Sequence, residues 1–132
     1  MKLITRDTDY AIRAVSYIAK KNNKVVSVAE LVERLKIPRP FLRKILQVLN
    51  KKRILNSHKG QGGGFVLALS KDKINLVELI EAFQGKFKLN ECFFKKDPCP
   101  NRKSCVLKKK IDNIERYVIR SLSKISIKDI VK

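Results

Sequence analysis

Three cysteines close together in the second half of the chain are the residues whose chemistry stands out. Six residues separate Cys92 from Cys99, and five separate Cys99 from Cys105. These spacings match neither a zinc ribbon nor a Cys-x-x-Cys redox motif, and an odd number of cysteines fits poorly with a disulfide framework. Three thiolates from one lysine-rich segment could bind zinc or an iron–sulfur cluster, or could remain free thiols. The spacing alone leaves these alternatives open.

The cysteines lie in a segment between two predicted helices. Residues 86–105 carry no regular periodicity, and so long a connection in a compact domain usually has a function. Residues 75–84 predict an amphipathic helix, which Gly85 ends. Residues 106–124 predict a longer helix whose apolar residues alternate in steps of three and four. Because this seam is typical of coiled coils, we expect the helix to join two subunits. The seam residues are Leu107, Ile111, Ile114, Val118 and Leu122.

The first half of the chain predicts a helix-turn-helix. An apolar helix is expected over residues 7–21, and Ser27 with Glu30 forms a capping-box pattern that opens the next helix. Pro38 ends that helix, because proline disfavours helical geometry in the residue before it. A third helix is expected over residues 39–52, with a buried stripe of Phe41, Leu42, Ile45, Val48 and Leu49. Two short helices joined by a tight turn are the pattern of a helix-turn-helix.

A glycine-rich stretch predicts a β-hairpin directly after these helices. Residues 54–58 and 65–69 favour strands, and four of the five residues from Gly60 to Gly64 are glycine. We therefore expect a mainly α fold with a small β-hairpin wing, a winged helix-turn-helix followed by a long dimerisation helix. The expected division is a winged-helix DNA-binding domain over 1–85, a cysteine segment over 86–105, and a dimerisation helix with the C-terminal segment over 106–132.

The predicted recognition helix and wing are basic. In helix-turn-helix proteins the second helix enters the major groove, where arginine pairs with guanine and glutamine with adenine. A cation at a hairpin tip can enter a narrow minor groove. The simpler alternatives are a solvated basic face and, for His58, a surface strand residue. The predicted DNA contacts are Arg39, Arg43, Lys44 and Gln47 on the helix and His58, Lys59, Gly62 and Gly63 on the wing. Phosphate contacts are expected from Lys2, Arg6, Lys51 and Lys52.

The charge of the chain indicates a polyanionic partner. Its 132 residues carry 31 lysines and arginines against 12 acids, a net charge of +19. Such an excess is typical of nucleic-acid-binding proteins. No apolar run reaches membrane-spanning length and no signal-peptide core is present, so we expect a cytoplasmic protein without a membrane partner. An enzyme is disfavoured, because the chain has one histidine, no paired acidic site for Mg²⁺ and no phosphate-binding loop that opens a helix.

Several of these segments together resemble one bacterial family. The matching segments are Leu3–Thr5, Asp9–Ala11, Val28–Glu30, Ile37–Leu42, Gly60–Phe65, Glu78–Ala82 and the three cysteines. Over nearly the whole chain they resemble the IscR/NsrR-type winged-helix iron–sulfur regulators of transcription, nearer to NsrR in the cysteine segment. The resemblance implies a homodimer that binds a double-stranded DNA operator. It also implies a 2Fe–2S or 4Fe–4S cluster on Cys92, Cys99 and Cys105.

The resemblance also bears on the fourth ligand of the cluster. An IscR-like histidine would lie three residues after the last cysteine, where this chain has Lys108. An NsrR-like aspartate from the first helix of the other subunit aligns with Asp9, which is the ligand we expect. Asp9 also has a simpler explanation, since the helix dipole favours an acid in a first turn. The other nearby carboxylates are Asp7, Glu91 and Asp97.

A carboxylate ligand suits a sensor, because it exchanges more readily than a thiolate. Loss of Asp9 from the cluster would let the subunits shift and would move both recognition helices. A hundredfold change in operator occupancy needs only about 2.7 kcal/mol between the two states. The expected signals are nitric oxide, oxygen and iron shortage. The alternative function is a regulator of the same fold whose cysteines act as a thiol redox switch or a zinc site.

Overall fold

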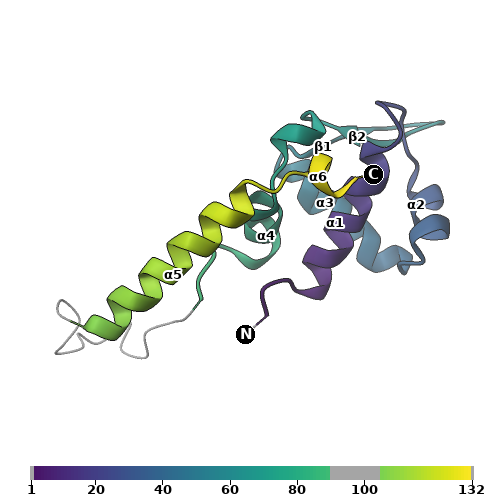
Figure 1. Cartoon of the computed structure of the whole chain (residues 1–132). Coiled ribbons are helices and arrows are strands. Elements are labelled where there is room, and N and C mark those ends of the chain that lie inside the picture. Colours follow the sequence, from purple (N-terminus) through teal and green to yellow (C-terminus); the bar gives the residue numbers. More distant parts are fainter. Residues whose placement is uncertain (1, 90–104, 132) are drawn as a thin grey trace.

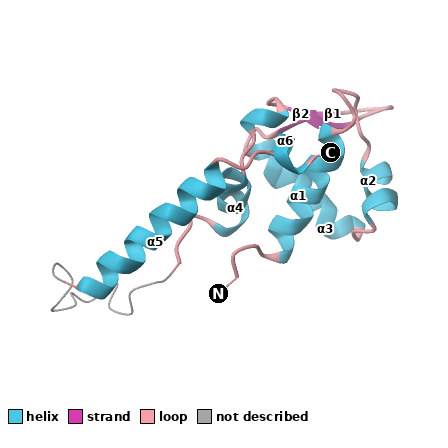
Figure 2. Ribbon diagram, viewed as in Figure 1, coloured by secondary structure: helices cyan, strands magenta, loops and turns pink. Residues whose placement is uncertain are grey.

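The chain forms a helical body with a β-hairpin on one side and a long helix that projects from the other (Figures 1 and 2). The computed structural model describes residues 2–89 and 105–131. Its helices are α1 (Arg6–Ala19), α2 (Val28–Leu35), α3 (Arg39–Lys51), α4 (Leu76–Gln84), α5 (Val106–Ser123) and α6 (Ile127–Ile130). The hairpin strands are β1 (Leu55–His58) and β2 (Gly64–Leu67), and a 3₁₀ turn, η1, covers Lys71–Lys73. The predicted fold class is confirmed.

Side-chain caps fix the starts of three helices. Thr5, Ser27 and Asn75 each accept a hydrogen bond from the amide three residues further on, at the starts of α1, α2 and α4. The capping box predicted at Ser27 is only half formed. Its glutamate, Glu30, makes no return bond to Ser27 in the described residues, because its carboxylate accepts a 2.5 Å hydrogen bond from the Tyr17 hydroxyl. The predicted bounds of α1 to α5 agree with the structure to within two residues.

The wing is an antiparallel hairpin that ends in a glycine turn. β1 and β2 pair along their full length. Across the tip, the Gly63 amide donates to the Gly60 carbonyl at 3.0 Å. A Cβ atom on Gly63 would lie 2.3 Å from the His58 carbonyl oxygen, so the turn requires glycine at this position. Val26 and Phe65 form a further antiparallel bridge, which attaches β2 to the segment before α2.

Two apolar clusters hold the body together. The larger cluster joins α1, α2 and α3 to the base of the wing and to α6. Its buried residues include Ala14, Val15, Ile18, Leu31, Leu42, Leu46, Leu49, Leu55, Ile74, Leu79 and Ile127. The smaller cluster joins α4 to the C-terminal part of α5, and its buried residues are Leu76, Ile80, Phe87 and Leu122. The predicted apolar stripes are therefore largely confirmed as core.

Two positions of the buried stripe predicted on α3 are not buried: Val48 is half-buried and Phe41 is exposed. Phe41 was expected in the buried stripe, but 40% of its surface is exposed. The buried face of α3 consists of Leu42, Ile45, Leu46 and Leu49. Phe41 lies at the edge of that face, where the guanidinium carbon of Arg6 on α1 lies 4.9 Å from the centroid of its ring. A cation over an aromatic face is a favourable contact, and it gives Phe41 a partner outside the core.

The helix α5 projects from the body and joins it again at its C-terminal end (Figure 1). Beyond α5, the Leu76 amide donates to the Ile125 carbonyl at 3.0 Å, and the Ile127 amide donates to the Ile74 carbonyl at 2.8 Å. Ile127 has no exposed surface. Residues 127–130, grouped above with the dimerisation helix, therefore pack into the winged-helix core. None of the described helices combines the length and apolarity needed to cross a membrane.

Candidate nucleic-acid interface and cysteine segment

The exposed face of α3 carries the four predicted base contacts. Arg39, Arg43, Lys44 and Gln47 are all exposed. Within residues 2–89 and 105–131, none of the three cations takes part in an ion pair. Their charges therefore remain available to a polyanion. Guanidinium and amide groups on the exposed face of one helix are the groups that pair with base edges in a major groove.

The hairpin tip carries the second group of predicted contacts. His58 ends β1 and Lys59 follows it, and both side chains are exposed. Gly62 is exposed as well, while Gly63 is half-buried within the turn. Backbone without side chains can approach a groove closely. Because β1 packs against α3, the wing is attached directly to the helix that carries the first group.

The four predicted phosphate contacts lie on two parts of the body. Lys2 and Arg6 lie just before and at the start of α1, while Lys51 and Lys52 lie at the end of α3. All four side chains are exposed. Arg6 is held over Phe41, so the start of α1 lies beside the start of α3.

A charged group joins α1 to the first helix of the helix-turn-helix. The Glu30 carboxylate accepts the Tyr17 hydroxyl hydrogen at 2.5 Å and lies 3.6 Å from the Lys21 ammonium. The Tyr17 hydrogen bond and, beside it, the charge of Lys21 lower the pKa of Glu30 below its ordinary value of 4.5. The ionised carboxylate therefore stabilises the packing of α2 against α1.

One of the three cysteines lies within the described residues. Cys105 caps α5, and its sulfur accepts a 3.4 Å hydrogen bond from the Lys108 amide. The N-terminal end of a helix is a favourable place for a thiolate, which is the form of cysteine that binds metals. Lys108, at the position of the IscR-like histidine, pairs with Asp112 at 2.8 Å, and this contact lowers the pKa of Asp112. Cys92 and Cys99 lie outside the described residues.

Asp9, the predicted fourth ligand, lies in the first turn of α1. Its carboxylate is 3.0 Å from Nε of Arg13, and its side chain is 45% exposed. The starts of α1 and α5 lie far apart in Figure 1, so Asp9 and Cys105 of one chain do not meet. Among the described residues, no three histidine, cysteine or acidic side chains form a group that could hold a metal ion. Three thiolates and a carboxylate are nevertheless a donor set that fits an iron–sulfur cluster.

A group of hydrogen bonds that sequence reasoning missed joins the end of α4 to the start of α1. The side-chain oxygen of Gln84 accepts from the Thr5 amide at 3.1 Å and from the Thr8 hydroxyl at 2.7 Å. Its side-chain nitrogen donates to the Leu3 carbonyl at 3.3 Å. We call these three hydrogen bonds the Gln84 bridge. Its partners are 76 to 81 residues apart in the sequence, and no local pattern marks them.

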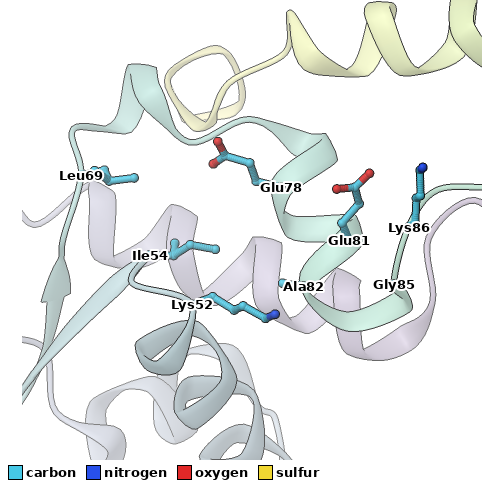
Figure 3. Close-up of a pocket in the computed structure, with 8 residues that line it drawn as sticks. All are labelled: Lys52, Ile54, Leu69, Glu78, Glu81, Ala82, Gly85 and Lys86. Carbon is cyan, nitrogen blue, oxygen red and sulfur yellow. The ribbon is translucent and has the colours of Figure 1, made fainter.

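An open pocket of about 710 Å³ lies between the end of α3, the base of the hairpin and α4 (Figure 3). Its lining residues are Lys52, Ile54, Leu69, Glu78, Glu81, Ala82, Gly85 and Lys86. This mixture of apolar, acidic and basic side chains does not by itself define a ligand.

Comparison with solved structures identifies the fold. CymR, the global cysteine regulator of B. subtilis, superposes with a TM-score of 0.78 at 21% identity, over 98% of this chain and 96% of CymR. IscR of T. potens superposes with a TM-score of 0.73 at 21% identity, over 98% of this chain and 85% of IscR. At these identities the likeness establishes the fold, which is that of winged-helix regulators of transcription.

The chain belongs to the Rrf2 family, because the family model described as an iron-dependent transcriptional regulator matches residues 4–132. An HTH-type transcriptional regulator of Aquifex aeolicus is 32% identical over 92% of this chain and 86% of that protein. The regulator NsrR of Oceanobacillus iheyensis is 29% identical over 95% of this chain and 86% of NsrR. The resemblance drawn from the sequence is confirmed. The protein is a transcriptional regulator of a DNA-binding, typically dimeric family, and it is not an enzyme.

Proposed function

We propose that this Rrf2-family regulator is a cytoplasmic homodimer whose affinity for a DNA operator is set by an iron–sulfur cluster. The observation that carries the DNA-binding part is the exposed basic face of α3 in the winged helix of a chain whose net charge is +19. Pairs between Arg43 or Gln47 and base edges would each supply about 1–3 kcal/mol of discrimination. Lys59 and the glycine tip of the wing would contact the neighbouring minor groove.

The exposed flank of α5 supports the dimer. Val118 and Leu122, on one flank of the predicted seam, pack on the α4 side of the same chain. The other flank is open, since Leu107 is 69% exposed and Ile114 is 52% exposed. An apolar strip of this kind is covered when two such helices pack side by side. A two-fold axis between them would present two copies of α3 to one operator, as dimeric helix-turn-helix proteins do.

The proposed ligands are Cys92, Cys99 and Cys105 of one subunit and Asp9 of the second subunit. Cys105 lies at the tip of α5, far from the α1 of its own chain (Figure 1). A ligand set that combines Cys105 with Asp9 therefore spans the two subunits. The cluster, when bound, supplies a centre that nitric oxide, oxygen or iron shortage can alter. Asp9, once released, keeps its ion pair with Arg13, and α1 is then free of its link to the other subunit.

Protein purified without oxygen tests the cofactor. The proposal expects visible absorbance with bound iron and sulfide, and it expects Cys99→Ala to lose all three while gel filtration still shows a folded dimer. A colourless protein that contains zinc, or no metal, would contradict the cluster. That result would favour the same fold with a zinc site or a thiol switch.

Operator binding by cluster-loaded and cluster-free protein tests whether the cluster controls the affinity for DNA. We expect affinities that differ by about tenfold or more, which corresponds to a coupling of roughly 1.4 kcal/mol. Asp9→Ala should change the cluster spectrum and reduce this difference. Asp7→Ala, which removes an acid from the same turn of α1, is the matched control and should change neither. Identical spectra and affinities for wild type and Asp9→Ala would exclude Asp9 as a ligand.

A further inference from the structure

We infer that Gln84 is a positioning residue that couples the cysteine segment to the recognition helix through the first turn of α1. The inference rests on the proposed function, since it concerns how the state of the cysteine segment reaches the DNA-binding surface. In the described part of the chain, the hydrogen bonds of the Gln84 side chain reach neither a cysteine nor the exposed face of α3. It acts through the residues at the start of α1.

A single amide group holds the whole start of α1. Through the Gln84 bridge, the two ends of one side-chain amide bind the backbone or side chains of Leu3, Thr5 and Thr8. The Thr5 hydroxyl also caps α1, at 3.4 Å from the Thr8 amide nitrogen. The end of α4 therefore fixes both the chain that enters α1 and the first turn of the helix.

The burial of Thr8 fixes which hydroxyl group donates in each of these hydrogen bonds. Thr8 has no exposed surface, and its hydroxyl hydrogen is donated to Gln84 at 2.7 Å. The Thr5 hydroxyl, 3.1 Å from the Thr8 hydroxyl, therefore donates the hydrogen of that contact. Loss of the Gln84 oxygen would cost this buried hydroxyl one of its two hydrogen-bond contacts, so a movement of the end of α4 favours a matching movement of the first turn of α1.

The same turn of α1 contacts the recognition helix. Arg6 lies between Thr5 and Thr8 in sequence, and its guanidinium stacks over Phe41 in the first turn of α3. Phe41 lies two residues from Arg43, a predicted base contact. Displacement of the start of α1 therefore changes the support of the part of α3 that would enter the major groove. Asp9, the proposed ligand, follows Thr8 directly, so the ligand and the bridge belong to one helical turn.

On its other side, Gln84 leads into the cysteine segment. Gly85 ends α4 with a φ of 75°, and the chain then packs along α5. Phe87 is buried in the cluster between α4 and α5, and the Leu89 amide donates to the Glu115 carboxylate at 2.9 Å. Lys88 lies 4.0 Å from the same carboxylate. Residues 85–89 thus connect Gln84 to the helix that Cys105 caps.

Two substitutions at Gln84 separate coupling from simple stability. Gln84→Met keeps the length of the side chain and removes all three hydrogen bonds. Gln84→Glu keeps the oxygen that accepts from Thr5 and Thr8. For each variant we would measure operator affinity with and without the cluster, the melting temperature, and amide hydrogen exchange of residues 5–9 and 39–43 in cluster-free protein.

We expect the cluster-loaded and cluster-free forms of Gln84→Met to bind the operator with affinities within about threefold of each other. We also expect it to speed exchange at the start of both α1 and α3 in cluster-free protein. Gln84→Glu should keep most of the wild-type difference in operator affinity and most of the wild-type protection from amide exchange. Thr8→Val removes the buried donor with little change of shape, and it should have the same effect as Gln84→Met on the affinity difference and on exchange. The double variant should show no larger effect than either single variant. Glu81→Gln, one turn earlier on the exposed face of α4, is the control and should leave the ratio unchanged.

The outcomes distinguish this inference from the function on which it rests. Equal affinity of loaded and cluster-free wild type would overturn the proposed function and the coupling with it. A large wild-type ratio that Gln84→Met retains would overturn the coupling alone. A lower melting temperature with equal weakening of both forms, and unchanged exchange over residues 39–43, would assign Gln84 a purely structural role.

Discussion

Arg43 lies on the second turn of α3 with its guanidinium free of ion pairs among the described residues. An arginine in this place can pair with two acceptors of one guanine, and such a pair depends on the identity of the base. Contacts to phosphate, by contrast, add affinity for any sequence. The proposed operator specificity therefore depends on Arg43 more than on the many other cations of the chain.

Arg43→Ala should weaken operator binding by about 1–3 kcal/mol, which is roughly five- to 150-fold, and should weaken binding to random DNA much less. Titration of both DNAs at several salt concentrations measures the two losses. Lys51→Ala, at the exposed end of the same helix, is the control. It should weaken both DNAs equally and make binding less dependent on salt. Equal losses on both DNAs for Arg43→Ala would mean that Arg43 contacts only phosphate.

Tyr17 and Glu30 predict a pH dependence of stability. The pKa of Glu30 is lowered in the folded chain, so its contribution is complete above the ordinary value of 4.5 and is lost as the pH falls through the lowered value. Tyr17→Phe should therefore melt at a lower temperature than wild type at pH 7, and the gap should shrink below about pH 4.5. The Tyr10 hydroxyl makes no hydrogen bond in the described residues, so Tyr10→Phe should show no such trend. A gap that stays constant with pH would contradict the role given to Glu30.

Single residues also mark where sequence reasoning succeeds and fails. Ser27 caps α2 as predicted, because a cap needs a partner only three residues away. Glu30 was expected to complete a capping box, but it bonds with Tyr17 of another helix. Phe41 was expected in the core, but Arg6 holds it at the edge. Both errors arise from partners on a different element, which no local pattern contains.

At the scale of elements, α5 has two apolar flanks with different surroundings. The seam predicted from sequence is continuous, yet the structure covers Val118 and Leu122 and leaves Leu107 and Ile114 open. Periodicity gives the direction in which apolar residues lie, but it does not give the neighbour that covers them. The sequence therefore predicted the helix and its bounds well, and it could not divide the seam between the chain's own body and a second subunit.

Ile114→Glu should break the proposed dimer while each subunit stays folded. The substitution places a charge on a strip that is 52% exposed in the single chain and would be buried between two subunits. Light scattering after gel filtration measures the mass, and circular dichroism checks the helix content. Asn113→Glu adds the same charge to the neighbouring exposed position and should leave a dimer. An Ile114→Glu protein that remains dimeric would place the interface elsewhere.

At the scale of the whole molecule, the core is closed by residues from both ends of the described chain. α6 packs against α1 and η1, and Ile127 belongs to the same cluster as Ala14 and Leu42. The sequence gave no sign of where this terminal segment would pack, since its contacts reach residues more than fifty positions away on η1 and more than a hundred positions away on α1. The three cysteines, in turn, could be proposed as a site from sequence alone, because the proposal rests on their chemistry and not on their packing.

Ile127→Ala should destabilise the winged-helix body itself. Loss of a fully buried isoleucine leaves a cavity and costs about 2–5 kcal/mol, which would lower the melting temperature by at least several degrees. Thermal unfolding followed by circular dichroism measures the effect. Ile130→Ala removes an isoleucine that is 37% exposed on the same helix and should cost much less. Equal, small effects for the two variants would mean that α6 contributes little to the fold.

The return of α6 to the core also sets an order of events during synthesis. Ribosomes add about 5–20 residues per second, so several seconds pass between the emergence of α3 and that of Ile127. Until then the winged helix lacks part of its core and remains incompletely folded. A newly made copy therefore completes this core only after its cysteine segment and its long helix have been synthesised.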